Sequence, residues 1–139
     1  LVEPHLIERV GGVAVAHPRG RRILSTGVSA QMLSLLRGVV LEGTGTEAAV
    51  PGYTVAGKTG TAAKIDPDGT YSTSRYVASF VGLVPATKPR LVVMVMVDEP
   101  RGGFYGGEVA APAFREIARF NLQYLEIPQD APKNAETDG

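Results

Sequence analysis

The chain has 139 residues, in which 14 Lys and Arg balance 14 Asp and Glu, so no net field attracts a polyanion and nucleic acid is not an expected partner. Hydrophobic residues make up 44% of the chain, which is enough for one globular domain with a core of its own. Cysteine is absent, which excludes disulfides and thiolate metal sites.

The segment 1–25 is expected to form short strands or extended connections, because brief apolar stretches alternate there with glycines and with Pro18. A helix is predicted to follow, with Ser29 as its N-cap and Gly43 as its stop signal. The apolar residues of this helix recur at helical spacing: Met32, Leu35, Leu36, Val39 and Val40.

Three strands are predicted next, over residues 54–64, 75–84 and 91–97. The turn at 66–69 and the loop at 86–89 are short, which favours antiparallel neighbours. The run 91–97 is apolar at both parities, so this strand is predicted to lie inside the sheet with both faces covered. The same run is the longest uninterrupted apolar stretch, and it is far too short for a membrane-spanning helix.

A glycine-rich loop at 101–107 leads into a predicted helix over 109–125, with Pro112 in its first turn and a broad apolar face for the sheet. The polar segment 128–139 has few apolar side chains and is predicted to be a disordered tail. Helix, three-stranded meander and helix together predict an α+β fold, an antiparallel sheet with helices packed on its faces.

The stretch 55–61 places a cation, two hydroxyls and a residue without a side chain on one strand between glycines. Lys58 and Gly60 share one face of a pleated strand, and Thr59 and Thr61 share the other. These side chains can serve one ligand only on an edge strand, where an extended peptide can also pair with the backbone. The expected ligand is a short peptide with a carboxylate, whose backbone approaches at Gly60.

Two local patterns have another interpretation, of which the first stays open and the second is set aside. A lysine between glycines on an edge strand can simply discourage edge-to-edge aggregation. The Gly-Thr pairs of 43–46 superficially resemble a phosphate loop, but no G-K-[ST] follows, so a plain helix-to-strand connection is predicted.

The Lys-Thr-Gly triplet belongs to the motif set shared by serine β-lactamases and penicillin-binding proteins. It lies in a longer match, from about Met32 to Pro128, that resembles class B penicillin-binding proteins of the division-specific type. The match is carried by residues 50–62, 80–86, 98–100 and 104–114. By this resemblance residues 1–127 are the C-terminal portion of a transpeptidase domain with the penicillin-binding and serine β-lactamase-like fold.

The resemblance also implies roles for individual residues. Lys58 would take part in the proton and charge network around the nucleophile, and the hydroxyls of Thr59 and Thr61 would hold the carboxylate of the substrate or of a β-lactam. The backbone N–H of Thr61 would form half of an oxyanion hole. Phe104 and Tyr105 match positions where relatives place aromatic side chains at the active-site mouth, although packing of the loop explains them equally well.

The chain lacks the other two motifs of this family. Ser34 is followed at the third position by Arg37 and Ser72 by Arg75, so no S-x-x-K is present, and S-x-N is absent as well. Acyl-enzyme chemistry needs an activated serine, so the isolated chain is expected to be inactive. Because the chain begins on a leucine, the earlier motifs and any membrane anchor are expected to lie upstream.

The implied activity is peptidoglycan D,D-transpeptidation through a serine acyl-enzyme, inhibited by β-lactams and used in septum formation. Neither a metal nor an organic cofactor is implied. The implied partners are stem peptides, β-lactams, the remainder of the domain and membrane proteins of the divisome, and the implied location is the outer side of the cytoplasmic membrane. The alternatives are a penicillin-binding sensor or scaffold module, and a relative of D,D-carboxypeptidases or β-lactamases.

Overall fold

The computed structural model describes residues 4, 6–17 and 20–131, and the chain divides into two units, residues 1–31 and 32–139. Within the first unit lies a small antiparallel hairpin, β1 (Arg9–Val10) paired with β2 (Val13–Ala14), and both strands are exposed. The prediction of short strands in this segment is confirmed.

Helix α1 runs from Thr26 to Leu41 and therefore begins before the predicted N-cap at Ser29. The hydroxyl of Ser25 accepts a hydrogen bond from the backbone N–H of Val28 at 3.1 Å, so Ser25 caps the first turn and Ser29 lies inside the helix. Within the second unit, Val40 in the last turn is the residue of α1 that enters the core.

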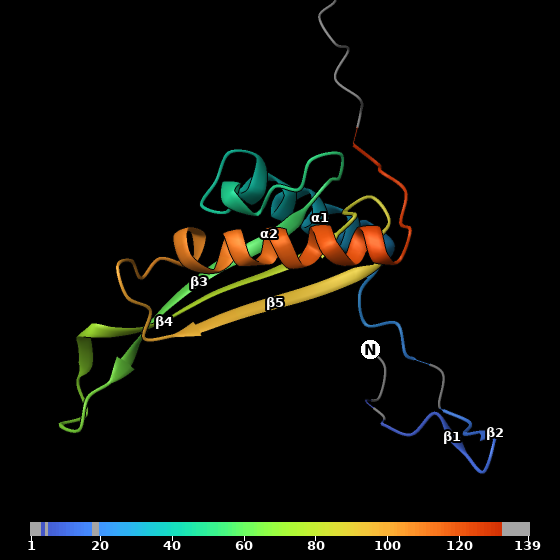
Figure 1. Cartoon of the computed structure of the whole chain (residues 1–139), viewed down its shortest axis with the longest axis horizontal. Coiled ribbons are helices and arrows are strands. Elements are labelled where there is room, and N and C mark those ends of the chain that lie inside the picture. Colours follow the sequence, from blue (N-terminus) through green and yellow to red (C-terminus); the bar gives the residue numbers. More distant parts are fainter. Residues whose placement is uncertain (1–3, 5, 18–19, 132–139) are drawn as a thin grey trace, which may run out of the picture. The chain divides into compact units, whose positions relative to one another are not determined.

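The sheet of the second unit has three antiparallel strands in the order β3-β4-β5 (Figure 1). Its strands are β3 (Ala56–Ile65), β4 (Tyr71–Val84) and β5 (Leu91–Asp98). The hairpin between β3 and β4 turns at residues 66–69, where Gly69 has φ of 84° and its N–H donates to the carbonyl of Asp66. The predicted strands and their antiparallel pairing are confirmed.

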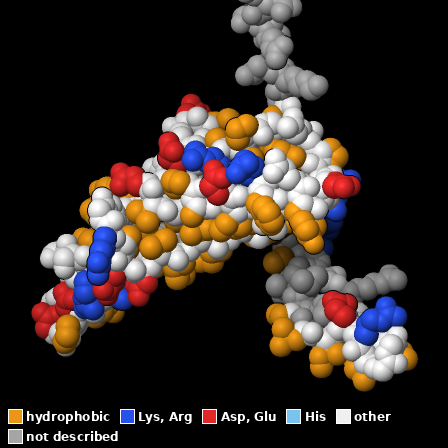
Figure 2. All heavy atoms as spheres, in the orientation of Figure 1, with side chains coloured by type: hydrophobic (Ala, Val, Ile, Leu, Met, Phe, Trp, Pro, Cys, Tyr) orange, Lys and Arg blue, Asp and Glu red, His pale blue; other side chains and the backbone are white. Residues whose placement is uncertain are grey.

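The prediction for β5 is wrong on both points: within the described residues it is an outer strand of this sheet, and one of its faces is exposed. Its residues alternate between half-buried and exposed, and Val92, Met94 and Met96 are exposed on the face away from the core. The apolar residues at alternate positions of β5 therefore lie on two different faces. One face packs under a helix, and the other is exposed within the described residues. Figure 2 shows hydrophobic side chains gathered along this strand.

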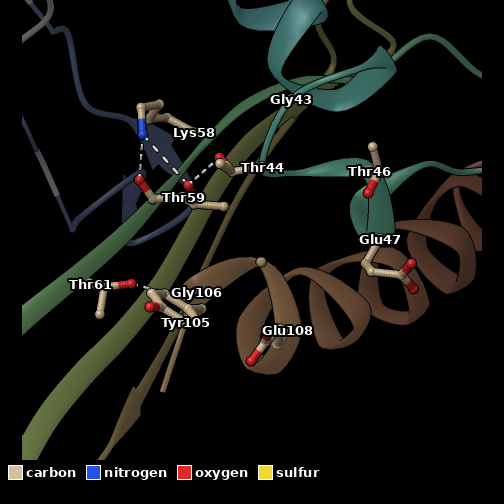
Figure 3. A pocket seen from close by; sticks show the side chains of 11 residues that line it. Gly43, Thr44, Thr46, Glu47, Lys58, Thr59, Thr61, Tyr105, Gly106 and Glu108 are labelled. Atoms are coloured by element: carbon tan, nitrogen blue, oxygen red, sulfur yellow. Dashed lines mark hydrogen bonds between the residues drawn. The ribbon is translucent and has the colours of Figure 1, made fainter. Parts of the chain in front are cut away.

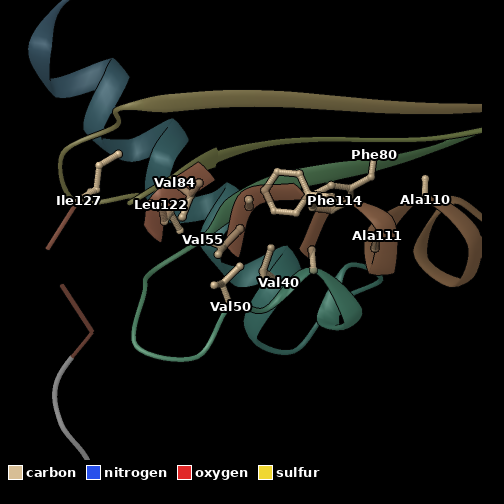
Figure 4. Close-up of a cluster of buried hydrophobic side chains, with 12 residues drawn as sticks. Val40, Val50, Val55, Phe80, Val84, Ala110, Ala111, Phe114, Leu122 and Ile127 are labelled. Atoms are coloured by element: carbon tan, nitrogen blue, oxygen red, sulfur yellow. The ribbon is translucent and has the colours of Figure 1, made fainter. Parts of the chain in front are cut away.

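Helix α2 (Gly106–Tyr124) lies across the other face of the sheet and closes the core (Figure 4). It begins at Gly106 rather than at Val109, so Pro112 lies inside the helix and not in its first turn. Phe80 of β4 and Phe114 of α2 meet edge to face, with ring centroids 4.8 Å apart. Around them packs the rest of the buried cluster: Val40, Ala48, Val50, Val55, Val84, Ala110, Ala111, Ala118, Leu122 and Ile127.

Charged side chains join the far ends of the three strands, at one end of the view in Figure 2. Lys64 of β3 donates to Asp98 at 2.9 Å and to Glu99 at 2.8 Å, and these hydrogen bonds raise its pKa. Arg75 of β4 pairs with Asp66, and its hydrogen bond lowers the pKa of that carboxyl. The pairs of Lys64 are exposed and the pair of Arg75 with Asp66 is partly buried, so each contributes only modestly to stability.

The segment after α2 packs back against the loop that precedes β3. The hydroxyl of Tyr53 donates to the carbonyl of Ile127 at 2.6 Å, and the carboxylate of Asp130 accepts from the backbone N–H of Thr54 at 2.7 Å. Residues 128–131, assigned to the predicted tail, are thus held by hydrogen bonds, while 132–139 lie outside the described residues. No helix in the described part of the chain is long and apolar enough to cross a membrane.

Candidate active site

A cavity of about 530 Å³ lies beside β3, between this strand, the connection that follows α1 and the first turn of α2 (Figure 3). Each of these elements contributes part of the wall. The lining residues are Lys58, Thr59 and Thr61 from the strand, Gly43, Thr44, Thr46 and Glu47 from the connection, and Tyr105, Gly106, Gly107 and Glu108 from the start of the helix.

The predicted edge position of the Lys-Thr-Gly strand agrees with the sheet, because within the described residues β3 pairs only with β4. Thr59 pairs with Phe80 and Thr61 with Ala78, which are buried under α2. Lys58 pairs with Val81, which is partly exposed on the opposite face. The cavity thus has access to both faces of the strand at its free edge.

Lys58 is exposed, and its ammonium stays close to the strand (Figure 3). Nζ donates to the carbonyl of Thr59 at 2.9 Å and lies 3.5 Å from Thr59 Oγ1. A positive charge and a hydroxyl therefore lie together on one side of the cavity, which is an arrangement suited to a carboxylate.

Other elements hold the two threonine hydroxyls of the strand. Thr44 Oγ1 lies 2.7 Å from Thr59 Oγ1, and the backbone N–H of Gly106 donates to Thr61 Oγ1 at 3.1 Å. Sequence reasoning missed both partners, since each contact joins residues far apart in the chain. The repeated Gly-Thr pairs were the only local signal at Thr44.

Glycines allow α2 to begin directly against β3. A Cβ on Gly106 would lie 2.2 Å from the carbonyl oxygen of Ser79 and 2.6 Å from that of Gly60. A Cβ on Gly107 would lie 2.2 Å from the carbonyl oxygen of Thr44. At Gly60, the space that a Cβ would take lies 2.5 Å from Ser79 Oγ, so this glycine admits a neighbouring side chain of its own sheet.

The two predicted aromatic residues have different positions. Tyr105 lines the cavity, whereas Phe104 lies between two other rings and is not part of the cavity wall. Phe104 stacks on Tyr76 of β4 with ring centroids 4.6 Å apart, and its ring lies tilted against that of Tyr105 with centroids 4.4 Å apart. Phe104 thus supports Tyr105, and Tyr76, which sequence reasoning missed, anchors the stack to the sheet.

Two carboxylates complete the wall. Glu108 lies in the first turn of α2, where the helix dipole favours a negative charge, and Glu47 lies 3.6 Å from Arg115 in an exposed ion pair. No cluster of three or more His, Cys, Asp or Glu able to hold a metal occurs in the described segments. The groups in the wall that can bind an anionic group are the ammonium of Lys58 and the hydroxyls of Thr59 and Thr61.

Comparisons with known proteins agree with this geometry. The sequence model of the penicillin binding protein transpeptidase domain matches residues 1–119. The probable peptidoglycan D,D-transpeptidase PenA of Neisseria gonorrhoeae is 41% identical over 120 residues, which are 85% of this chain and 20% of that protein. Stage V sporulation protein D of Bacillus subtilis is 45% identical over 108 residues, 77% of this chain and 17% of that protein. The chain therefore spans a fifth or less of these relatives.

Solved structures match as well. The transpeptidase domain of penicillin-binding protein 3 from Burkholderia pseudomallei has a TM-score of 0.75 at 43% identity, over 84% of this chain and 36% of that one. Penicillin-binding protein 3 from Mycobacterium tuberculosis, complexed with ampicillin, has a TM-score of 0.76 at 35% identity, over 88% of this chain and 29% of that one. Both the predicted α+β fold and the resemblance read from the motifs are confirmed: the chain belongs to the family of penicillin binding protein transpeptidase domains.

Proposed function

We propose that this chain forms the carboxylate-binding wall of a peptidoglycan D,D-transpeptidase, an enzyme that cross-links stem peptides through a serine acyl-enzyme and is inhibited by β-lactams. The observation that carries the proposal is the cavity at the free edge of β3, which is lined by Lys58 and by two tethered threonine hydroxyls. The names of the relatives support the same reaction.

The residues of the strand bind the substrate through their side chains and through the backbone. Thr59 and Thr61 donate hydrogen bonds to the carboxylate of the terminal D-Ala, and the ammonium of Lys58 adds charge to that contact and to the proton network of the nucleophile. The backbone N–H of Thr61 stabilises the oxyanion, and Tyr105, supported by Phe104, borders the mouth. Gly60, predicted as the point where the substrate backbone approaches, does not line the cavity, and the space beside it is filled by the side chain of Ser79.

The reaction itself needs a serine that this chain does not supply, in a segment carrying S-x-x-K and S-x-N. The serine oxygen attacks the carbonyl carbon of the penultimate D-Ala and the C–N bond to the terminal D-Ala breaks, with the serine proton passing to the leaving amine. An amine of a neighbouring stem peptide then attacks the ester and releases the serine. A β-lactam stops at the first step because its own C–N bond opens within a ring and the leaving amine stays attached.

The partners follow from this activity. The substrates are peptidoglycan stem peptides, and β-lactams are supported as inhibitors because the similar penicillin-binding protein 3 from Mycobacterium tuberculosis forms complexes with ampicillin and with aztreonam. Residues 1–127 would dock on the remainder of the same transpeptidase domain. We place the enzyme at the outer side of the cytoplasmic membrane with a role in septum formation, alongside membrane proteins of the divisome.

Labelling with a fluorescent penicillin tests the proposal. The isolated chain is expected to stay unlabelled, and the natural polypeptide that carries this segment is expected to form a stable covalent adduct. Lys58→Ala in that polypeptide should slow labelling by about a hundredfold or more, because a charged group of the proton network is lost. The control, Lys88→Ala, removes an exposed lysine in the loop after β4, outside this cavity, and should change the rate by less than about twofold.

Three results would contradict the proposal. A covalent adduct on the isolated chain would show that the serine lies on it. Rapid turnover of the penicillin would indicate a β-lactamase. Labelling without any cross-linking of stem peptides would indicate a sensor or scaffold module.

A further inference from the structure

Thr44 lies outside the Lys-Thr-Gly motif, in the connection between α1 and β3 that the sequence marks only by repeated Gly-Thr pairs. Its Oγ1 is nevertheless 2.7 Å from Thr59 Oγ1, and both residues line the cavity (Figure 3). An exposed hydroxyl of one element thus contacts a residue of the motif on another element.

The backbone of Thr44 is held from both sides, so its hydroxyl has a defined position. On one side, the N–H of Gly45 donates to the carbonyl of Val39 in the last turns of α1 at 2.9 Å. On the other side, the carbonyl oxygen of Thr44 packs against Gly107, so closely that a Cβ added there would lie only 2.2 Å from this oxygen. The end of one helix and the start of the other thus fix Thr44 beside the strand.

The direction of the hydrogen bond decides what Thr59 can do. The ammonium of Lys58 has only protons to offer, so at 3.5 Å from Thr59 Oγ1 it acts as a donor. If Thr44 also donates, both contacts use lone pairs of Thr59, and the single proton of Thr59 is left for a ligand. If Thr59 donates to Thr44 instead, no proton remains for a carboxylate.

We propose that Thr44 is a positioning residue: it donates its hydroxyl proton to Thr59 Oγ1 and so aims the proton of Thr59 at the carboxylate of the ligand. The inference rests on the proposed function, because it needs an anionic ligand at Thr59. An anion in the cavity favours this direction, since the chain from Thr44 through Thr59 to the ligand strengthens each hydrogen bond in it.

The test measures the second-order rate constant for acylation by a fluorescent penicillin in the natural polypeptide that carries this segment. Thr44→Val keeps the shape of the side chain and removes its proton donor, so acylation should slow by about tenfold, as expected for one lost hydrogen bond to an anion-binding group. Thr44→Ser keeps the donor and should restore the rate to within about twofold. Thr73→Val, an exposed threonine on β4 away from the cavity, is the matched control.

A double-mutant cycle separates positioning from a merely structural role. In a Thr59→Val background the hydroxyl that Thr44 orients is gone, so adding Thr44→Val should slow acylation by less than a further factor of about two. A full tenfold loss in that background, a wild-type rate for Thr44→Val, or a failure of Thr44→Ser to restore the rate would overturn the inference while leaving the proposed function intact. Absence of acylation in the wild-type polypeptide would instead overturn the proposed function, and the inference with it.

Discussion

Gly82 lies opposite Gly57 in the pairing of β4 with β3, and aromatic rings fill the space that side chains at both positions would need. A Cβ on Gly57 would lie 2.4 Å from Phe80 Cζ, and a Cβ on Gly82 would lie 2.6 Å from two ring atoms of Phe114. The glycine before Lys58 thus has a packing reason: it lets the edge-to-face aromatic pair lie close to the sheet.

Gly82→Ala is therefore expected to destabilise the chain by about 1 to 3 kcal/mol, because Phe80 and Phe114 are fully buried and have no room to move aside. The measurement is the free energy of unfolding in urea. Gly38→Ala is the matched control: nothing lies within 4 Å of a Cβ at that helical position, so alanine should stabilise α1 by about 0.5 to 1 kcal/mol. Equal effects of the two substitutions would contradict the packing argument.

Asp130 gives the segment after α2 a dependence on pH. Its partial burial alone would raise the pKa of the carboxyl, but hydrogen bonds from Thr54 and Thr87 outweigh burial and hold the pKa below its ordinary value of 3.8. A pKa that folding lowers means that the charged form stabilises the fold. The contribution is complete above about pH 3.8 and is lost as the pH falls through the lower value of the folded state.

Asp130→Asn should then lower the free energy of unfolding at pH 7 by on the order of 1 to 2 kcal/mol, the range for hydrogen bonds to a charged group. The difference between wild type and variant should shrink as the pH falls below about 3.8. Denaturant unfolding at several pH values measures it. Glu126→Gln removes an exposed carboxylate near the same end of α2 and should change stability little; a difference for Asp130→Asn that did not depend on pH would refute the argument.

At the scale of elements, the start of α2 sets the distance between the helix and the Lys-Thr-Gly strand. Gly106→Ala would bring a Cβ against backbone oxygens of Ser79 and Gly60, which cannot turn aside as a side chain can. We expect the free energy of unfolding to fall by about 1 to 3 kcal/mol. In the natural polypeptide that carries this segment, penicillin labelling should also slow, because the N–H of Gly106 moves away from Thr61. Gly103→Ala should be tolerated, since its nearest neighbour at 3.3 Å is the end of the Glu108 side chain. Normal labelling of Gly106→Ala would show that this contact does not position the strand.

The sequence was informative where a pattern is local. Alternation, β-branched residues and short turns predicted the three strands and their antiparallel order, and a lysine on a glycine-flanked strand predicted an edge strand. The helix starts were misplaced, because Gly27 and Gly106 argue locally against a helix while capping by Ser25 and contact with β3 favour one. Thr44 and Tyr76 could not be found, since their partners, Thr59 and Phe104, are distant in the chain.

At the scale of the whole molecule, three segments far apart in the sequence build the candidate site. The connection after α1 carries Thr44, β3 carries Lys58 and Thr59, and the start of α2 carries Gly106. Packing of α2 on the sheet brings the helix to the strand, and the glycines of the connection let the chain turn towards both. The same packing of α2 on the sheet thus forms the core and positions the wall of the site. Substitutions under α2 are therefore expected to affect ligand binding as well as stability.

The face of the sheet opposite α2 carries an apolar surface, with Val92 exposed to 69% and both Met94 and Met96 to 60%, on an outer strand whose edge is unpaired within the described residues. Apolar strands with a free edge are sites of association, so the isolated chain should self-associate as its concentration rises.

The double substitution Met94→Gln, Met96→Gln should shift the chain towards the monomer in sedimentation velocity, because the substitution removes apolar area from that strand. The exposed rings of α2 are the competing surface: Phe120→Gln, Tyr124→Gln removes as many apolar side chains, at 64% and 75% exposure, from a helix whose backbone is already hydrogen-bonded. If the helix variant restored the monomer and the strand variant did not, association would run through α2 and the argument from the strand edge would fail.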